Sequence, residues 1–196
     1  MRGAGEQDAE LTAWLERLAG LRTRAERLFA GMAADVWNRA PADGGWSAAE
    51  CAAHVVEANE KYLEPLRAEI ARGRAAGVTG APPFRYRWFG RWFVAQIEPP
   101  VRRKLPAPEA FRPARRTYDP SIGREVVRTL DEAANVIRSS AGLDRRRLRI
   151  TSPAARFLRF DLGMGMLLLI AHTDRHLGQI ENLTFDTQPS RPRRGS

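Results

Sequence analysis

The chain has 196 residues, of which 43% are hydrophobic and 28% charged, a composition typical of one soluble globular domain. A single cysteine, Cys51, excludes an intramolecular disulfide framework. Residues 1–8 lack the apolar segment of a secretory signal. The longest apolar run, residues 164–171, is too short to cross a bilayer. The formal charge of +9 suggests a nucleic-acid-binding protein. The basic residues, however, are almost all arginines and are spread over the whole chain rather than gathered on one segment. We therefore expect a cytoplasmic protein whose main partner is neither a nucleic acid nor a membrane.

The first predicted helix spans residues 6–32, where apolar residues recur at a helical period and Glu and Arg occupy the other side. A polar, turn-rich connection over residues 38–45 ends it. Ser47 then stands three residues before Glu50, the spacing of a capping box in which the two side chains satisfy each other's backbone amides. We therefore expect a second helix to begin at about residue 48, with Trp46 anchoring its entry against the core.

The second predicted helix runs from about residue 48 to residue 72, and His54 borders its apolar stripe. Glycines and prolines then begin a long irregular crossover, about residues 73–118. Within it, residues 84–93 (FRYRWFGRWF) form an aromatic–arginine block whose aromatic residues pair at helical spacing, which predicts a short helix. For this block we rank a lid over the open end of the helices, or a dimer surface, above a base-stacking platform.

A third helix is predicted to begin at Asp119-Pro120, since proline favours the first turn of a helix, and to end near Gly142. Residues 143–159 are expected to be a basic connection without strands. The fourth predicted helix spans residues 161–182, and the tail, residues 188–196, is rich in Pro, Arg and Ser and is expected to be disordered. Four long amphipathic helices with one crossover predict an all-α four-helix bundle over residues 1–187.

The three histidines are the chain's main candidates for chemistry. His172 and His176 stand four residues apart in the last predicted helix, so their imidazoles stack one turn apart within its apolar stripe and point into the core. His54 lies on the second predicted helix. Two neutral nitrogens from one helix and a third from a facing helix form a ligand set for a divalent metal with an open position. Zinc, nickel, cobalt and iron(II) all accept such ligands.

Two side chains near the histidines have a functional and a structural interpretation. Gln179 follows His172 by seven residues and would either hydrogen-bond a ligand or substrate, or fill a polar gap in the packing. Glu57 lies one turn beyond His54 and would be a fourth ligand, a general base or a solvated ion pair.

For three other residues the structural interpretation is favoured. Cys51 precedes His54 by one turn, and we interpret it as a small buried residue in the apolar stripe rather than as a nucleophile or ligand. Asp174 and Arg175 are expected to point away from the histidine face and to make surface or inter-helix contacts.

Two stretches resemble the signatures of the DinB/YfiT superfamily: residues 45–54 (GWSAAECAAH) and residues 172–180 (HTDRHLGQI). The similarity covers roughly residues 8–184. It implies an up-down-down-up bundle that binds a divalent metal through His54, His172 and His176, with water at the remaining position. Some members of the family are S-transferases or isomerases that use low-molecular-weight thiols such as bacillithiol or mycothiol. The aromatic–arginine block matches no signature, so the resemblance does not indicate the substrate.

The leading hypothesis is a metal-dependent thiol S-transferase or hydrolase that activates a thiol cosubstrate or water for attack on an electrophilic small molecule. The second is a non-catalytic metal-binding bundle, a stress-response or interaction protein. The two differ at the site, because an enzyme keeps an open metal position whereas a structural site is closed by a fourth protein ligand. A homodimer formed through the aromatic residues is also expected.

Overall fold

The computed structural model describes residues 8–99 and 109–185. This part of the chain is mostly helical, as predicted, with one small sheet. Its elements are the helices α1 Ala9–Ala30, α2 Ala34–Trp37, α3 Ala48–Ala75, α4 Trp88–Ile97, α5 Ile122–Arg138 and α6 Leu162–Phe185, the short 3-10 helix η1 Glu109–Phe111, and the strands β1 Arg149–Ser152 and β2 Ala155–Asp161.

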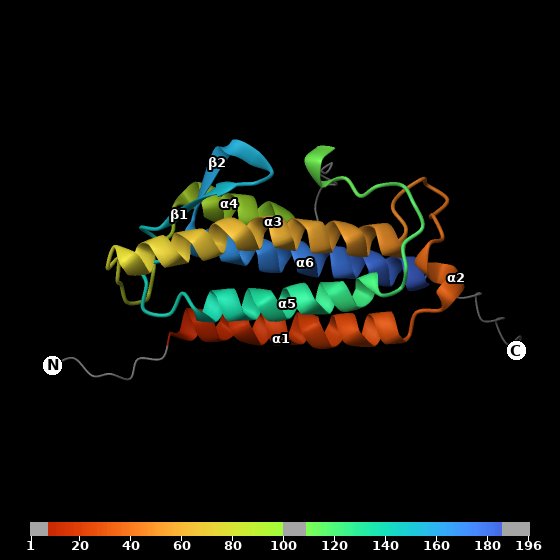
Figure 1. The fold of residues 1–196 in the computed structure, drawn as a ribbon, viewed down its shortest axis with the longest axis horizontal. Coiled ribbons are helices and arrows are strands. Elements are labelled where there is room, and N and C mark those ends of the chain that lie inside the picture. The colour runs from red at the N-terminus through yellow and green to blue at the C-terminus, as the bar shows by residue number, and fades with distance from the viewer. Residues whose placement is uncertain (1–7, 100–108, 186–196) are drawn as a thin grey trace, which may run out of the picture.

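The four long helices α1, α3, α5 and α6 lie side by side (Figure 1), and they are the four helices that the apolar periodicity predicts. The colour gradient in Figure 1 shows that α1 and α6 run in one direction and α3 and α5 in the other. One leucine from each helix, at most 2% exposed, illustrates the shared core: Leu18, Leu66, Leu130 and Leu169. Burying one such side chain contributes about 1.5–3 kcal/mol to the free energy of unfolding, so packing between these helices holds the fold together.

The start of α3 is fixed by the predicted capping box. The hydroxyl of Ser47 accepts a hydrogen bond from the amide of Glu50 at 3.2 Å, and the carboxylate of Glu50 accepts one from the amide of Ser47 at 2.9 Å. Both side chains are buried. Because this box sets where the helix begins, it also sets the position of His54, seven residues after Ser47.

Buried polar side chains tie three of the long helices together next to the histidines. The amide of Asn59 on α3 donates to the hydroxyl of Thr129 on α5 at 3.0 Å. The hydroxyl of Thr173 on α6 donates to the side-chain oxygen of Asn59 at 3.1 Å. All three residues are at most 1% exposed. Since a buried polar group is costly when its partner is displaced, this chain of bonds favours one relative placement of the helices.

The prediction of a connection without strands over residues 143–159 is wrong. Strands β1 and β2 pair antiparallel, with Ile150 opposite Phe160. These two side chains are buried, 2% and 1% exposed, whereas the neighbouring Thr151 and Arg159 are exposed. Strand β2 does not follow the period-2 pattern of a half-buried hairpin, because Asp161, next to Phe160, is also buried and Phe157 is 86% exposed. The chain is therefore mostly helical with a small sheet rather than purely helical.

The short helix predicted within the aromatic–arginine block is present as α4, and its aromatic residues divide between two sides. Phe89 and Phe93 pack on Phe160 of β2, with ring centroids 6.2 and 5.2 Å apart. Trp88 and Trp92 instead are 76% and 52% exposed. One face of α4 is thus part of the core and the other faces outward.

Helix α4 packs on α6, and Gly90 permits the close approach. A Cβ atom at Gly90 would lie 2.9 Å from Cγ of Met164 on α6, so the glycine has a packing reason within a helix. Part of the predicted crossover, residues 100–108, and the predicted tail, residues 188–196, lie outside the described residues. Among the helices that are described, none has the length and apolar character needed to span a membrane.

Candidate metal centre

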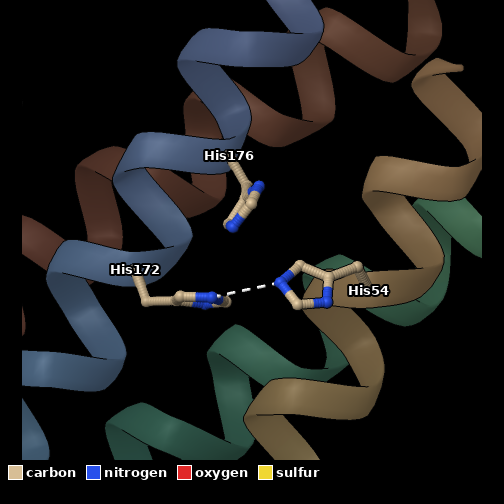
Figure 2. A group of neighbouring side chains, drawn as sticks. All are labelled: His54, His172 and His176. Atoms are coloured by element: carbon tan, nitrogen blue, oxygen red, sulfur yellow. Dashed lines mark hydrogen bonds between the residues drawn. The ribbon is translucent and has the colours of Figure 1, made fainter. Parts of the chain in front are cut away.

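The three histidines meet between α3 and α6. Figure 2 shows His54 extending from α3 towards His172 and His176 on α6. One ring nitrogen from each residue lies within 4.8 Å of the others, and the Nε2 atoms of His54 and His172 are 3.2 Å apart. His54 and His176 are 2% and 7% exposed, and His172 is half-buried. The structure thus brings together the histidine pair that the spacing indicates and the third histidine predicted on a facing helix.

A backbone carbonyl fixes the orientation of His54. Its Nδ1 lies 2.6 Å from the carbonyl oxygen of Phe111. Since a carbonyl only accepts, Nδ1 carries the proton and donates it. The Nε2 atom of neutral His54 is then left with a lone pair that faces His172. A ligand histidine whose second nitrogen donates to a carbonyl is the arrangement that orients imidazoles at metal sites.

Burial keeps all three imidazoles neutral. Desolvation is the largest cause in each case, and it lowers the pKa of His54, lowers that of His172 to about 3, and lowers that of His176 well below its ordinary value. The charge of Arg175 acts in the same direction on His172 and His176, and so would a proton on a neighbouring histidine. At neutral pH the cluster therefore presents uncharged nitrogens, the form that binds a metal ion.

The donor set fits a divalent ion in two further respects. Two imidazole nitrogens bound to one tetrahedral ion at about 2.0–2.1 Å stand about 3.3 Å apart, which is close to the 3.2 Å between His54 and His172. In addition, Nδ1 of His176 is buried and has no hydrogen-bond partner within the part of the chain that the structure describes. A buried nitrogen with no partner is costly unless something else binds there. The three-histidine cluster could therefore hold a metal ion.

A cavity of about 350 Å³ opens onto the histidines. Its apolar lining includes Trp46, Tyr62, Phe93, Ile97, Phe111 and Leu169. The polar side chains that line it are those of Asn59, Arg175, Gln179 and the three histidines. A mostly apolar cavity with a few convergent polar groups is the usual form of a small-molecule site.

Aromatic side chains surround the histidines. The ring of Trp46 lies 4.8 Å from that of His54 and 6.3 Å from that of His176, centroid to centroid. Trp46 was expected to anchor the entry to α3, and it also forms a wall of the cavity. The hydroxyl of Tyr62 on α3 lies 2.8 Å from that of Ser152, so the hairpin β1–β2 is joined to the cavity wall.

Sequence reasoning missed Tyr62, Asn59 and Phe111 as parts of this site. Tyr62 belongs to the apolar stripe of the second predicted helix, two turns after His54, and this position is a signal that could have placed it beside the histidines. Phe111 comes from the crossover, 57 residues from His54 in the chain. No local pattern indicates which backbone carbonyl meets His54.

Gln179 lies at the cavity, whereas Glu57 lies outside it. Gln179 lines the cavity together with the histidines. The carboxylate of Glu57 lies 2.6 Å from Nζ of Lys61, one turn further along α3, and both side chains are well exposed. Glu57 is not among the residues that line the cavity, so its position corresponds to the ion-pair interpretation.

Cys51 lies on α3 as a buried free thiol, 3% exposed, and does not line the cavity. Burial raises the pKa of its thiol to about 12, which leaves it protonated and unreactive at neutral pH. The interpretation of Cys51 as a small core residue is confirmed.

The expectation that Asp174 and Arg175 both point away from the histidines is half right. Asp174 accepts hydrogen bonds from Arg17 at 3.0 Å and Arg24 at 2.7 Å, both on α1, which is the predicted inter-helix contact. Arg175, in contrast, is only 8% exposed and lines the cavity. The reason is that α6 packs against α1, α3 and α4 together, so its buried arc is wider than the stripe of a helix with one covered face.

Comparison with known proteins identifies the family of the chain. A family model described as the DinB superfamily matches residues 17–180, a span that includes all three histidines and most of the four long helices. Searches among curated proteins and among solved structures found no match. Since the family model covers most of its length, the chain belongs to the DinB superfamily.

Proposed function

We propose that this DinB-superfamily protein binds one divalent metal ion through His54, His172 and His176 and uses it as a thiol S-transferase or hydrolase. The observation that carries the proposal is the convergence of three neutral imidazoles, two buried and one half-buried, on the edge of a mostly apolar cavity. The substrate is a small electrophilic molecule held in that cavity. Zinc, nickel, cobalt and iron(II) are the ions compatible with three nitrogen ligands.

The order of the long helices supports a finer description of the fold. We propose that α1, α3, α5 and α6 form the up-down-down-up four-helix bundle of the family, as one domain over residues 1–187. The opposite directions of the α1/α6 and α3/α5 pairs in Figure 1 support this topology. In such a bundle, metal sites are built from side chains on facing helices, and this is the relation between His54 and the α6 histidines.

The surroundings of the histidines favour an open site over a closed one. Three protein nitrogens leave at least one position for an exchangeable ligand. None of the described residues that line the cavity is an aspartate or glutamate that would fill it. An ion bound there lowers the pKa of a coordinated water or thiol towards neutrality. The walls of the same space are mostly apolar, and Gln179 supplies a hydrogen-bonding group.

Cobalt substitution separates the proposed enzyme from a non-catalytic metal-binding bundle. The Co(II)-loaded protein is titrated with 2-mercaptoethanol while its visible spectrum is recorded. A spectral change at saturating thiol shows that thiol reaches an open metal position, which the proposal requires. An unchanged spectrum on fully loaded protein means a closed, structural site and contradicts it. The variant with both His172→Ala and His176→Ala controls for cobalt bound elsewhere.

Turnover is tested with the metal-loaded protein and a panel of thiols against 1-chloro-2,4-dinitrobenzene, and with 4-nitrophenyl acetate for hydrolysis. We expect one of these activities to require metal and to disappear in the double histidine variant. The homodimer expected from the aromatic–arginine block stays a prediction. The exposure of Trp88 and Trp92 is compatible with it, and light scattering of the purified protein checks it.

A further inference from the structure

Arg175 gives the cavity a charge that the metal proposal does not use. It follows His172 by three residues and immediately precedes His176 on α6. Its side chain lines the same cavity as both histidines, although the residue is only 8% exposed. Among the described lining residues there is no lysine, aspartate or glutamate. Arg175 is therefore the one side chain with a full charge among the described residues that line the cavity.

The remaining wall is suited to a flat apolar body. Four aromatic side chains line the cavity, from four different parts of the chain: Trp46, Tyr62, Phe93 and Phe111. Aromatic rings favour offset or edge-on contacts with another ring and exclude water from it. The volume of about 350 Å³ is at the small end of the range for small-molecule sites.

We infer that the substrate of this site is a small molecule with an aromatic or similarly flat apolar body and one carboxylate, which Arg175 binds. A guanidinium matches a carboxylate with two parallel N–H···O bonds, so it fixes orientation as well as position. In a cavity with apolar walls that attraction is screened less than in water. Because Arg175 shares one rigid helix with His172 and His176, a bound carboxylate holds the rest of the molecule at a set distance from the histidines.

The statement that the bound molecule is a substrate rests on the proposed function, whereas the binding of its carboxylate by Arg175 does not. The carboxylate preference comes from Arg175 and exists with or without an ion on the histidines. The first experiment therefore uses metal-free protein. Isothermal titration calorimetry compares 2-naphthoate with 2-naphthamide, which has the same ring system and no charge. A charged hydrogen bond contributes about 1.5–3 kcal/mol, so we expect the naphthoate to bind about 10- to 100-fold more tightly.

Substitutions then assign the preference to Arg175. Arg175→Met keeps most of the apolar volume of the side chain and is expected to reduce the ratio of the two affinities to about one. Arg175→Lys is expected to keep part of the preference for 2-naphthoate, because the charge remains while the bidentate geometry is lost. Arg91→Met is the matched control. Arg91 is an exposed arginine on the outer side of α4 and does not line this cavity, so its loss changes net charge equally and should leave the ratio unchanged.

Equal affinities of the two naphthalene compounds for the wild-type protein would overturn the inference without any variant having to fold. A preference that survives in folded Arg175→Met, checked by circular dichroism, would overturn the role of Arg175. N-Acetylcysteine tests a second source of the carboxylate, the thiol cosubstrate. Tighter binding of N-acetylcysteine than of 2-naphthoate would assign the guanidinium to the thiol and contradict the assignment to the substrate.

Repeating the titrations after zinc loading separates the two proposals. If the protein binds no metal but keeps the Arg175-dependent preference, the proposed metal chemistry fails and the carboxylate site stands. If zinc binds stoichiometrically and the preference is absent from both metal-free and zinc-loaded protein, the carboxylate inference fails and the metal site stands.

Discussion

Two groups of buried polar side chains differ in whether opposite charge from the chain compensates their burial, and the contrast separates structure from function. The first surrounds Arg145, whose side chain is completely buried. Its guanidinium donates to both carboxylate oxygens of Asp8 at 2.6 and 2.8 Å and to Glu10 at 3.0 Å. Tyr86 donates to the same Glu10 at 2.6 Å. Burial is thus compensated by opposite charge from within the chain.

The second group is the histidine cluster of His54, His172 and His176. Here burial is not compensated by opposite charge, because the lowered pKa values keep the rings neutral. The nitrogens converge on one another rather than on acidic groups. A buried cation that carboxylates of the chain neutralise is explained by the fold, whereas buried nitrogens that converge on one another without such charges indicate a ligand.

The largest expected effect is on the Arg145 group. Arg145→Leu removes the cation that neutralises Asp8 and Glu10, so we expect the free energy of unfolding to fall by about 3 kcal/mol, since breaking a buried ion pair typically costs about 3–5 kcal/mol. Urea denaturation measures this. Metal content should stay at the wild-type value, because the histidines do not contact this group.

The matched control is Arg91→Leu, which removes an exposed arginine and should change the free energy of unfolding by less than about 0.5 kcal/mol. If Arg145→Leu were as mild as its control, the Arg145 group would not be a structural one. The contrast between a structural Arg145 group and a functional histidine cluster would then not hold.

The second effect, on the histidine cluster, is metal-linked stability. Zinc at about 100 times its dissociation constant should raise the free energy of unfolding by about 2.7 kcal/mol, because it binds the folded state only. The variant with His172→Ala and His176→Ala should show no such increase. Urea denaturation with and without zinc gives the comparison. An equal zinc effect in both proteins would place the ion elsewhere.

A third effect follows from the pKa of His172, which burial lowers from 6.5 to about 3. Between these two values the unfolded chain binds a proton that the folded chain does not, so stability falls as the pH falls through about 6.5. For His172 alone the metal-free protein should lose about 2 kcal/mol between pH 7.5 and pH 5. His54 and His176 shift in the same direction.

Urea denaturation at a series of pH values, with His172→Leu for comparison, checks this prediction. The variant should show a shallower decrease towards acid, because it has one titrating group fewer. Parallel curves for the wild type and the variant would mean that His172 accepts its proton as readily when folded as when unfolded. That result would contradict its burial as a neutral base.

The smallest expected effect concerns Glu57. Because its carboxylate pairs with Lys61 on a well-exposed part of α3, Glu57→Gln should change the free energy of unfolding by less than about 0.5 kcal/mol. Zinc affinity, measured by competition with a chelator, should be unchanged. A loss of about tenfold or more in zinc affinity would instead support Glu57 as a fourth ligand or as a partner of a ligand histidine.

Local patterns predicted the parts of the site that depend on one helix at a time. The capping box placed the start of α3 and hence His54, and the four-residue spacing placed His172 and His176 on one face of α6. These features depend on helical geometry, which repeats every 3.6 residues and can be read from spacing. The DinB superfamily was likewise indicated by two short motifs and then confirmed over residues 17–180.

Features that depend on contacts between distant segments could not be predicted in this way. The carbonyl that orients His54 comes from Phe111, beyond a crossover with no regular pattern. The inward position of Arg175 follows from α6 being covered by three helices, which its own sequence does not specify. The hairpin of β1 and β2 was missed for another reason: Ile150 and Phe160 do alternate with polar neighbours, but the many arginines suggested a solvated connection.

The metal content of the purified protein tests the central claim most directly. Untagged wild-type protein and the variant with His172→Ala and His176→Ala are analysed by inductively coupled plasma mass spectrometry, as purified and after reconstitution with zinc. The account predicts close to one equivalent of a divalent metal in the wild type and none in the variant, with both proteins folded. Wild-type protein that stays metal-free after reconstitution, or a variant that retains its metal, would contradict the three-histidine centre.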